Sequence, residues 1–301
     1  MRIAHISDLH LLALDGAIPH RLFNKRITGY ANLRLRRQHE HRPELVYAIA
    51  EHLRKEQVDH VCITGDVTNL ALEVEMQLVR RVLDDVLGLP KERVSIVPGN
   101  HDVYTKGAER SRRFFHAFEP YLQSDLPEFA TDHVAGPYPF VKLRGPVAII
   151  GLASARSRLP FVAAGKLGKK QLEALSAILR HPEVKKRTPV ILQHHPLHNP
   201  PSAVKARLEG LDDAEKLKDE LAIVPRGLLL HGHLHKRLRN RQSTREGEIA
   251  AIGATSASLV DESPKKMAGF NTYDFADDGS LVAIGSQAID AQAGRFFPVE
   301  I

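Results

Sequence analysis

Five short segments of the sequence place Asp, Asn or His directly after an apolar run. In chain order they are SDLH, TGDVTN, PGNHD, QHHPLH and HGHLH. Carboxylate oxygens, amide oxygens and imidazole nitrogens are the ligands that hold divalent transition metals such as Mn, Fe, Zn and Co. Each segment alone is an ordinary turn sequence, but burying all five without a metal would be costly. Together they predict a metal site.

Two of the segments repeat their polar residues at a spacing of two. Asp8 and His10 form one such pair, and His233 and His235 form another. On an extended strand end, residues two apart point the same way, so each pair could bind one ion from one face. Among the other polar residues of the five segments are Asp66, Asn69, Asn100, His101, Asp102, His194, His195 and His231.

The elements that must position these residues alternate along the chain. Apolar, strand-like runs cover 2–7, 59–64, 93–98, 147–152, 188–193 and 226–231. Helical periodicity predicts helices over Pro43–Lys55, Leu70–Leu87, Ala108–Phe118, Lys169–Leu179 and Asp212–Leu221. This alternation predicts an α/β layered fold, in which the carboxyl ends of the strands line the ligand crevice. Near the end of the chain, Asp278-Gly279 predicts a hairpin turn between two strands.

Composition narrows the class of protein. The chain has 301 residues, a formal charge of +6 and a pI near 9.4, which favours anionic partners such as phosphates. No repeat, linker or break in composition divides it, so we expect one domain over 1–301. The single cysteine, Cys62, lies in an apolar run and is predicted to be a buried strand residue. No stretch is apolar for long enough to span a bilayer, and we expect a cytoplasmic protein.

The series D-x-H, G-D, G-N-H-D, H-x-P and G-H-x-H, from Asp8 to His235, resembles the calcineurin-like metallophosphoesterases. The motifs as they stand in this sequence are most similar to those of the bacterial phosphodiesterase branch of that family. The resemblance implies a four-layer αββα sandwich of two mixed β-sheets, with a dinuclear metal site at the carboxyl ends of the strands. It assigns one metal to Asp8, His10, Asp66 and His235, and the other to Asp66, Asn100, His194 and His233. Asp66 would bridge the two.

Two divalent cations about 3.5 to 4 Å apart can share a hydroxide and clamp the oxygens of a phosphoryl group. We therefore expect a metal-dependent phosphodiesterase that hydrolyses P–O bonds. His101 is the candidate to contact the phosphate or to protonate the leaving oxygen, with Asp102 as its candidate support. His195 and His231 are expected to support the ligands, whereas His41 and the remaining histidines match no motif and are expected at the surface or in packing.

A basic amphipathic segment over residues 20–42 carries seven Lys or Arg against one Glu. It could cap the site, lie in an anionic membrane interface at the inner face, grip nucleic acid, or form a solvated basic rim over its own core. The alternatives to a general phosphodiesterase are a pyrophosphatase or phosphodiesterase acting on a lipid-linked substrate such as a lipid A precursor, and a nuclease acting on DNA. A metal-free scaffold is a further alternative. Metal identity and oligomeric state stay open.

Overall fold

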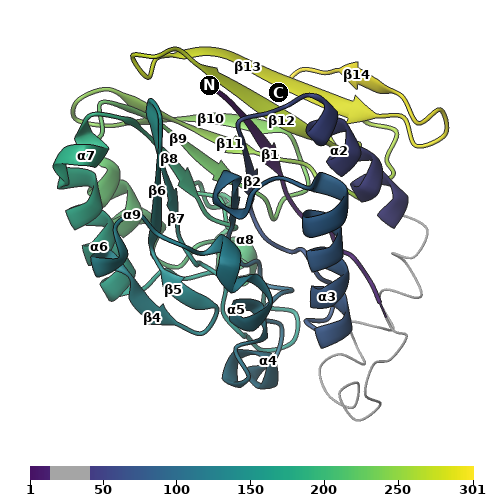
Figure 1. Cartoon of the computed structure of the whole chain (residues 1–301). Helices are drawn as coiled ribbons and strands as arrows, with labels where there is room; N and C mark the ends of the chain where they lie inside the picture. Colours follow the sequence, from purple (N-terminus) through teal and green to yellow (C-terminus); the bar gives the residue numbers. More distant parts are fainter. Residues whose placement is uncertain (14–40) are drawn as a thin grey trace.

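Two six-stranded β-sheets lie face to face in the computed structural model, which describes residues 1–13 and 41–301 (Figure 1). The first sheet has the strand order β14-β13-β12-β1-β2-β3, and the second has the order β10-β11-β9-β8-β7-β6. Helices cover the outer faces, with α2 and α3 on one side and α6, α7 and α9 on the other (Figure 1). The predicted four-layer αββα arrangement is therefore confirmed.

Both sheets are mixed. In the first, β1 (Arg2–Ile6) pairs in parallel with β2 (His60–Ile63) and antiparallel with β12 (Gly269–Phe275). In the second, β7, β8, β9 and β11 run parallel, while β6 and β10 are antiparallel edge strands. The other strands are β3 (Val94–Ile96), β4 (Thr131–His133), β5 (Gly136–Tyr138), β6 (Phe140–Arg144), β7 (Val147–Gly151), β8 (Thr188–Leu192), β9 (Arg226–His231), β10 (Leu238–Ser243), β11 (Glu248–Gly253), β13 (Leu281–Ile289) and β14 (Phe296–Pro298).

Alternation along the buried strands builds two cores. In β7, Ile149 belongs to an apolar cluster shared with the first sheet, whereas Ile150 belongs to a cluster shared with α6 and α9. A strand with helices on one face and a sheet on the other is buried on both, which is why these runs read as continuously apolar. The helices are α2 (Pro43–Lys55), α3 (Glu73–Arg81), α4 (Lys106–Arg110), α5 (Arg113–Phe118), α6 (Lys169–Arg180), α7 (Pro182–Lys185), α8 (Ala203–Glu209) and α9 (Ala214–Leu221).

Most predicted elements are present with small shifts. Helix α2 has the predicted bounds, the six predicted strands form, and Asp278-Gly279 lies in the turn between β12 and β13. The predicted helix over 108–118 is wrong as one element, because Arg112 adopts φ 45° and separates α4 from α5. Helix α3 begins later than predicted, since the Glu75 carboxylate accepts from the backbone amides of Leu70 and Leu72 before the helix starts.

Three further expectations concern the basic segment, membrane spans and the single cysteine. The basic segment 20–42 lies outside the described residues except for its last two positions. Among the helices of the described chain, none combines the length and apolar character that a bilayer crossing requires. Cys62 is buried in β2, as predicted.

Candidate metal centre

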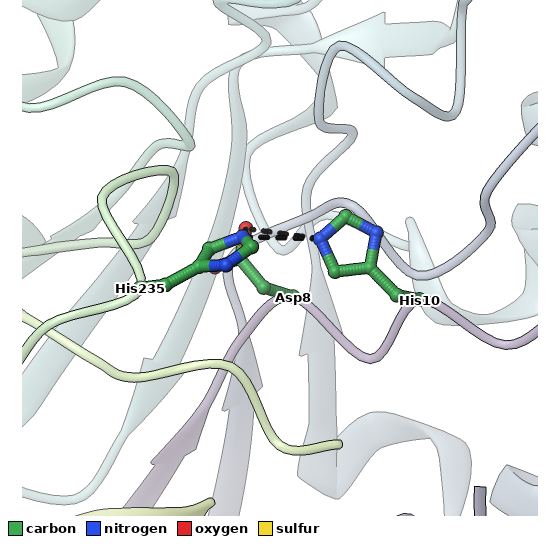
Figure 2. A group of neighbouring side chains, drawn as sticks. All are labelled: Asp8, His10 and His235. Carbon is green, nitrogen blue, oxygen red and sulfur yellow. Dashed lines mark hydrogen bonds and ion pairs between the residues drawn. The ribbon is translucent and has the colours of Figure 1, made fainter. Parts of the chain in front are cut away.

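The loops that follow β1, β2, β3, β8 and β9 meet at one edge of the sandwich and bring the predicted ligands together. The Asp8, His10 and His235 side chains point toward one another, although His235 comes from the loop after β9 and the other two from the loop after β1 (Figure 2). His235 Nε2 lies 3.2 Å from Asp8 Oδ1 and 3.1 Å from His10 Nε2. Two imidazole nitrogens and a carboxylate oxygen thus converge on one point.

A second group of side chains adjoins the first. His194 Nε2 lies 3.3 Å from Asp66 Oδ2 and 3.1 Å from Asn100 Oδ1. His233 Nδ1 lies 3.1 Å from the same Asn100 oxygen. Asp66 is also within 4.8 Å of the ligand atoms of both Asp8 and His10, in two separate groupings. All seven predicted ligands therefore form one cluster, with Asp66 in contact with both halves.

Five of the seven predicted ligands have left-handed backbone conformations. Asp8, His10 and Asp66 have φ of 52°, 45° and 49°, and His233 and His235 have φ of 69° and 51°. The expectation that spacing on an extended strand end aims each pair is therefore wrong, because β1 ends at Ile6 and β9 at His231. Asp and His tolerate the left-handed region better than β-branched residues, and such strain is typical of functional sites.

Glycines let two ligand loops approach the carboxylates. A Cβ placed on Gly99 would collide with the side chain and backbone nitrogen of Asp66. A Cβ on Gly232 would collide with Asp8 and Ser7. Gly99 is thus required for close contact between the loops after β2 and β3.

Backbone carbonyls orient two of the ligand rings. The Nδ1–H of His194 donates to Thr64 O at 2.7 Å, which leaves Nε2 facing Asp66. The Nε2–H of His233 donates to Glu209 O at 2.9 Å, which leaves Nδ1 facing Asn100. Metal-binding histidines commonly donate their second ring nitrogen to such an acceptor, because this fixes the tautomer.

Asp102 and His195 are buried supports, but the expectation that Asp102 supports His101 is wrong, because the Asp102 carboxylate bonds to the ligand loops and His101 Nδ1 pairs with Asn69 O. The Asp102 carboxylate accepts from the amides of Gly99 at 2.9 Å, Val67 at 3.3 Å and Thr68 at 2.9 Å, and so joins the two ligand loops. It does not line the cavity in front of the ligands. His195 bonds to Ser154 Oγ at 2.8 Å, and its ring centre lies 4.7 Å from that of His233.

Electrostatics favour the ionised carboxylates and the neutral His233 that metal ligands need, but hold a proton on His194 that a bound metal would displace. Burial raises the pKa of Asp8 and of Asp66, but the neighbouring histidines outweigh it and hold both pKa values below the usual range. Burial and the nearby His194 lower the pKa of His233 to about 3, so its ring is neutral. At His194, burial lowers the pKa but the Asp66 charge outweighs it and raises it to about 9. Two ionised carboxylates in a buried site call for a cationic partner.

His101 lies at the edge of this cluster, in a cavity of about 660 Å³. Its backbone amide donates to Asp66 Oδ1 at 2.7 Å, and its Nδ1 pairs with Asn69 O at 2.7 Å. Its ring centre lies 5.1 Å from that of His10. The remaining lining of the cavity includes Ala163, Pro196, His198, Asn199, Pro200, Pro201, Lys205, Glu209, Leu234, Lys236, Leu238 and Asn240.

Sequence reasoning missed one neighbour of the cluster. The ring centre of His41 lies 5.0 Å from that of His10 and 5.9 Å from that of His235. His41 pairs with Leu259 in an isolated antiparallel bridge, and its Nδ1 lies 2.8 Å from Ser258 Oγ. Because His41 is distant from every ligand motif in the sequence, no spacing signal could have placed it here.

Comparisons with known proteins agree with this geometry. The sequence model for calcineurin-like phosphoesterases matches residues 1–237. The fold is similar to a dimetal phosphatase from Danio rerio, at a TM-score of 0.56 and 17% identity over 95% of this chain and 94% of that one. It is also similar to a purple acid phosphatase from yellow lupin seeds, at a TM-score of 0.61 and 12% identity over 99% of this chain and 52% of the lupin protein, about half its length. Among curated protein sequences, none matches.

Proposed function

The chain belongs to the calcineurin-like phosphoesterase family, and from this premise we propose that it hydrolyses phosphodiesters at a pair of divalent cations. The observation that supports this most is the convergence of the two buried carboxylates, four imidazoles and one amide oxygen. Calcineurin-like phosphoesterases use a dinuclear divalent metal site, and this set of donors fits one.

The residues divide between the two ions as the family pattern implies. Asp8, His10 and His235 would hold one ion, Asn100, His194 and His233 the other, and Asp66 would contact both. When bound, such a pair supplies a nucleophilic oxygen at neutral pH and neutralises charge on the phosphoryl group. Mn, Fe, Zn and Co all suit these ligands.

His101 is the residue we assign to the reacting phosphate. Its ring reaches the cavity beside Asp66 and His10, where it can donate to a phosphoryl oxygen or protonate the leaving oxygen. Its amide bond to Asp66 ties its position to the bridging ligand. Asp102 acts as a positioning residue, because its hydrogen bonds go to the loops that carry Asp66 and Asn100.

The charge of the cavity favours a diester over a monoester. Among the described residues that line it, the cationic side chains are Lys205 and Lys236, and Lys205 lies 3.9 Å from the Glu209 carboxylate. None of these described lining residues is an arginine, so none of them can bind a phosphate dianion through two parallel hydrogen bonds. A diester carries one negative charge fewer than a fully ionised monoester, so it needs less compensation.

A substrate panel tests this proposal. Metal-free protein reconstituted with Mn²⁺ is assayed on bis(p-nitrophenyl) phosphate and on p-nitrophenyl phosphate. Cyclic nucleotides, glycerophosphodiesters, nucleotide-sugar lipids and DNA follow. We expect the diester to be the better of the two nitrophenyl substrates. A preference for the monoester would overturn the diester assignment. Strong selectivity for the lipid-linked pyrophosphate or for DNA would instead favour one of the alternatives, and an anionic lipid surface would then be a natural partner.

A further inference from the structure

A second, smaller cavity of about 330 Å³ adjoins the ligand cluster. Among the residues that the structure describes, it shares Leu234 and His235 with the larger cavity and no others. Leu234 and His235 therefore form the wall between the two spaces. The other residues that line the small cavity are His41, Leu259, Val260, Asp261 and Lys266.

The small cavity is anchored to the ligand loops. His41 packs edge-on against His10, and its Nδ1 contacts Ser258 Oγ. Ser258 Oγ lies 3.2 Å from Ser256 Oγ, which donates to the backbone oxygen of Asp8 at 2.6 Å. The side of the small cavity that His41 forms is thus fixed relative to Asp8 and His10, two of the predicted first-metal ligands. A group bound in this cavity would therefore lie beside that metal position.

We infer that the small cavity holds the ester arm that stays on the phosphate, and that the larger cavity holds the arm that leaves. This assignment rests on the proposed function. In an in-line displacement the leaving oxygen must be protonated, and His101, the candidate acid, lines the larger cavity. The second arm of a diester then needs a separate space next to the same phosphorus, which the small cavity supplies.

The lining defines the chemical class of that arm. The lining exposes more polar than apolar surface: it consists of His41, His235, Asp261 and Lys266 beside Leu234, Leu259 and Val260. Lys266 Nζ and Asp261 Oδ2 form an ion pair at 3.5 Å. Ligand pockets range from about 300 to 1,000 Å³, so this one is at the lower end of the range. It therefore fits a compact alcohol whose polar groups pair with this lining beside a small apolar part, and the preferred substrates are diesters of such an alcohol.

Filling the cavity tests the inference. Val260→Trp is compared with wild type on phenyl p-nitrophenyl phosphate and on methyl p-nitrophenyl phosphate, which release the same leaving group. We expect kcat/KM to fall about tenfold or more for the phenyl ester and to stay within about twofold for the methyl ester, because only the phenyl arm needs the space. The matched control, Val282→Trp, replaces a valine that is 68% exposed on β13 and should leave both rates unchanged.

The outcomes are separable. If Val260→Trp keeps its fold and metal content, an equal fall in kcat/KM for both esters, or no fall for either, would overturn this inference and leave the proposed function untouched. If Val260→Trp does not fold, Val260→Ala decides: it enlarges the cavity and should raise kcat/KM for a naphthyl arm relative to a phenyl arm, and an unchanged ratio would contradict the inference. Failure of metal-loaded wild type to hydrolyse any of these esters would overturn the proposed function itself, and this inference with it.

Discussion

At the scale of single residues, the ligand cluster combines unusual backbone conformations with tightly specified hydrogen bonds. Asp8, Asp66 and His235 all have positive φ, and the rings of His194 and His233 are fixed by carbonyl oxygens behind them. Such positions persist only where the surrounding structure determines them. Hydrogen bonds from the surrounding protein thus fix the positions of these side chains.

His101→Ala tests whether His101 acts in the reaction and not in metal binding. Because His101 lies beside the ligands without being assigned to an ion, we expect the variant to keep its metal content and to lose turnover by about 10² to 10⁴. Metal content by elemental analysis and kcat on bis(p-nitrophenyl) phosphate are the two measurements. His116→Ala, which alters a histidine on α5, is the matched control. Loss of metal together with activity in His101→Ala would show that His101 is a ligand.

That the candidate ligands gather at one edge could be predicted from sequence, whereas their surroundings could not. Asp66, Asn100 and His194 each follow an apolar run, so the sequence alone predicts that each lies just after a strand. His41 reaches the site only because its bridge to Leu259 joins segments more than two hundred positions apart. The bonds of Asp102 likewise depend on a loop contact that no local pattern encodes.

At the scale of elements, a buried arginine ties the last ligand loop to the first sheet. Arg237 follows His235 by two positions and is 2% exposed. Its Nε donates to Ser286 Oγ at 2.7 Å, and its terminal nitrogens donate to Pro264 O at 2.6 Å, Met267 O at 2.8 Å and Gln287 O at 2.9 Å. This single side chain therefore links the loop after β9 to β13 and to the loop before β12.

Arg237→Met should therefore weaken both the fold and the site. Several buried acceptors would lose their donor, so we expect the free energy of unfolding to fall by about 2 to 4 kcal/mol. Metal affinity should fall as well, because the loop that carries His233 and His235 loses its anchor. Urea unfolding of the metal-free protein and metal titration measure the two effects. Arg239→Met, an exposed position on β10, is the control, and equal losses in both variants would contradict the anchoring role.

Element boundaries show why sequence reasoning predicted the centre of each sheet better than its edges. The central strands are buried on both faces, so their apolar runs are unmistakable, as in β8 and β9. The edge strand β10 is mostly exposed and reads LRNRQS, a polar stretch with no strand signal of its own. Its pairing with β11 comes from tertiary structure, which local propensity does not record.

At the scale of the whole molecule, a buried lysine joins the two sheets. Lys142 of β6 is 1% exposed, and its Nζ donates to Val94 O of β3 at 2.5 Å and to Lys91 O at 3.4 Å. Burial lowers its pKa from 10.5 to about 8. The unfolded chain therefore binds more protons than the folded one between these two pH values, and stability should rise as pH increases through that window.

Comparison of Lys142→Met with wild type isolates this effect. Across pH 8 to 10.5 the wild-type free energy of unfolding should gain up to about 3 kcal/mol that the variant does not gain. Denaturant unfolding at several pH values provides the measurement, with Lys170→Met on the exposed face of α6 as the control. If the free energy of unfolding changed with pH in the same way in wild type and in Lys142→Met, the lowered pKa of Lys142 would be refuted.

The most direct test of a two-cation phosphodiesterase is a titration of metal-free protein with Mn²⁺, followed by the rate of bis(p-nitrophenyl) phosphate hydrolysis. With protein well above the dissociation constants, the two ligand groups that share Asp66 predict no hydrolysis without metal and a rate that reaches its plateau at two equivalents per chain. A plateau at one equivalent, or no hydrolysis at any ratio, would contradict the assignment.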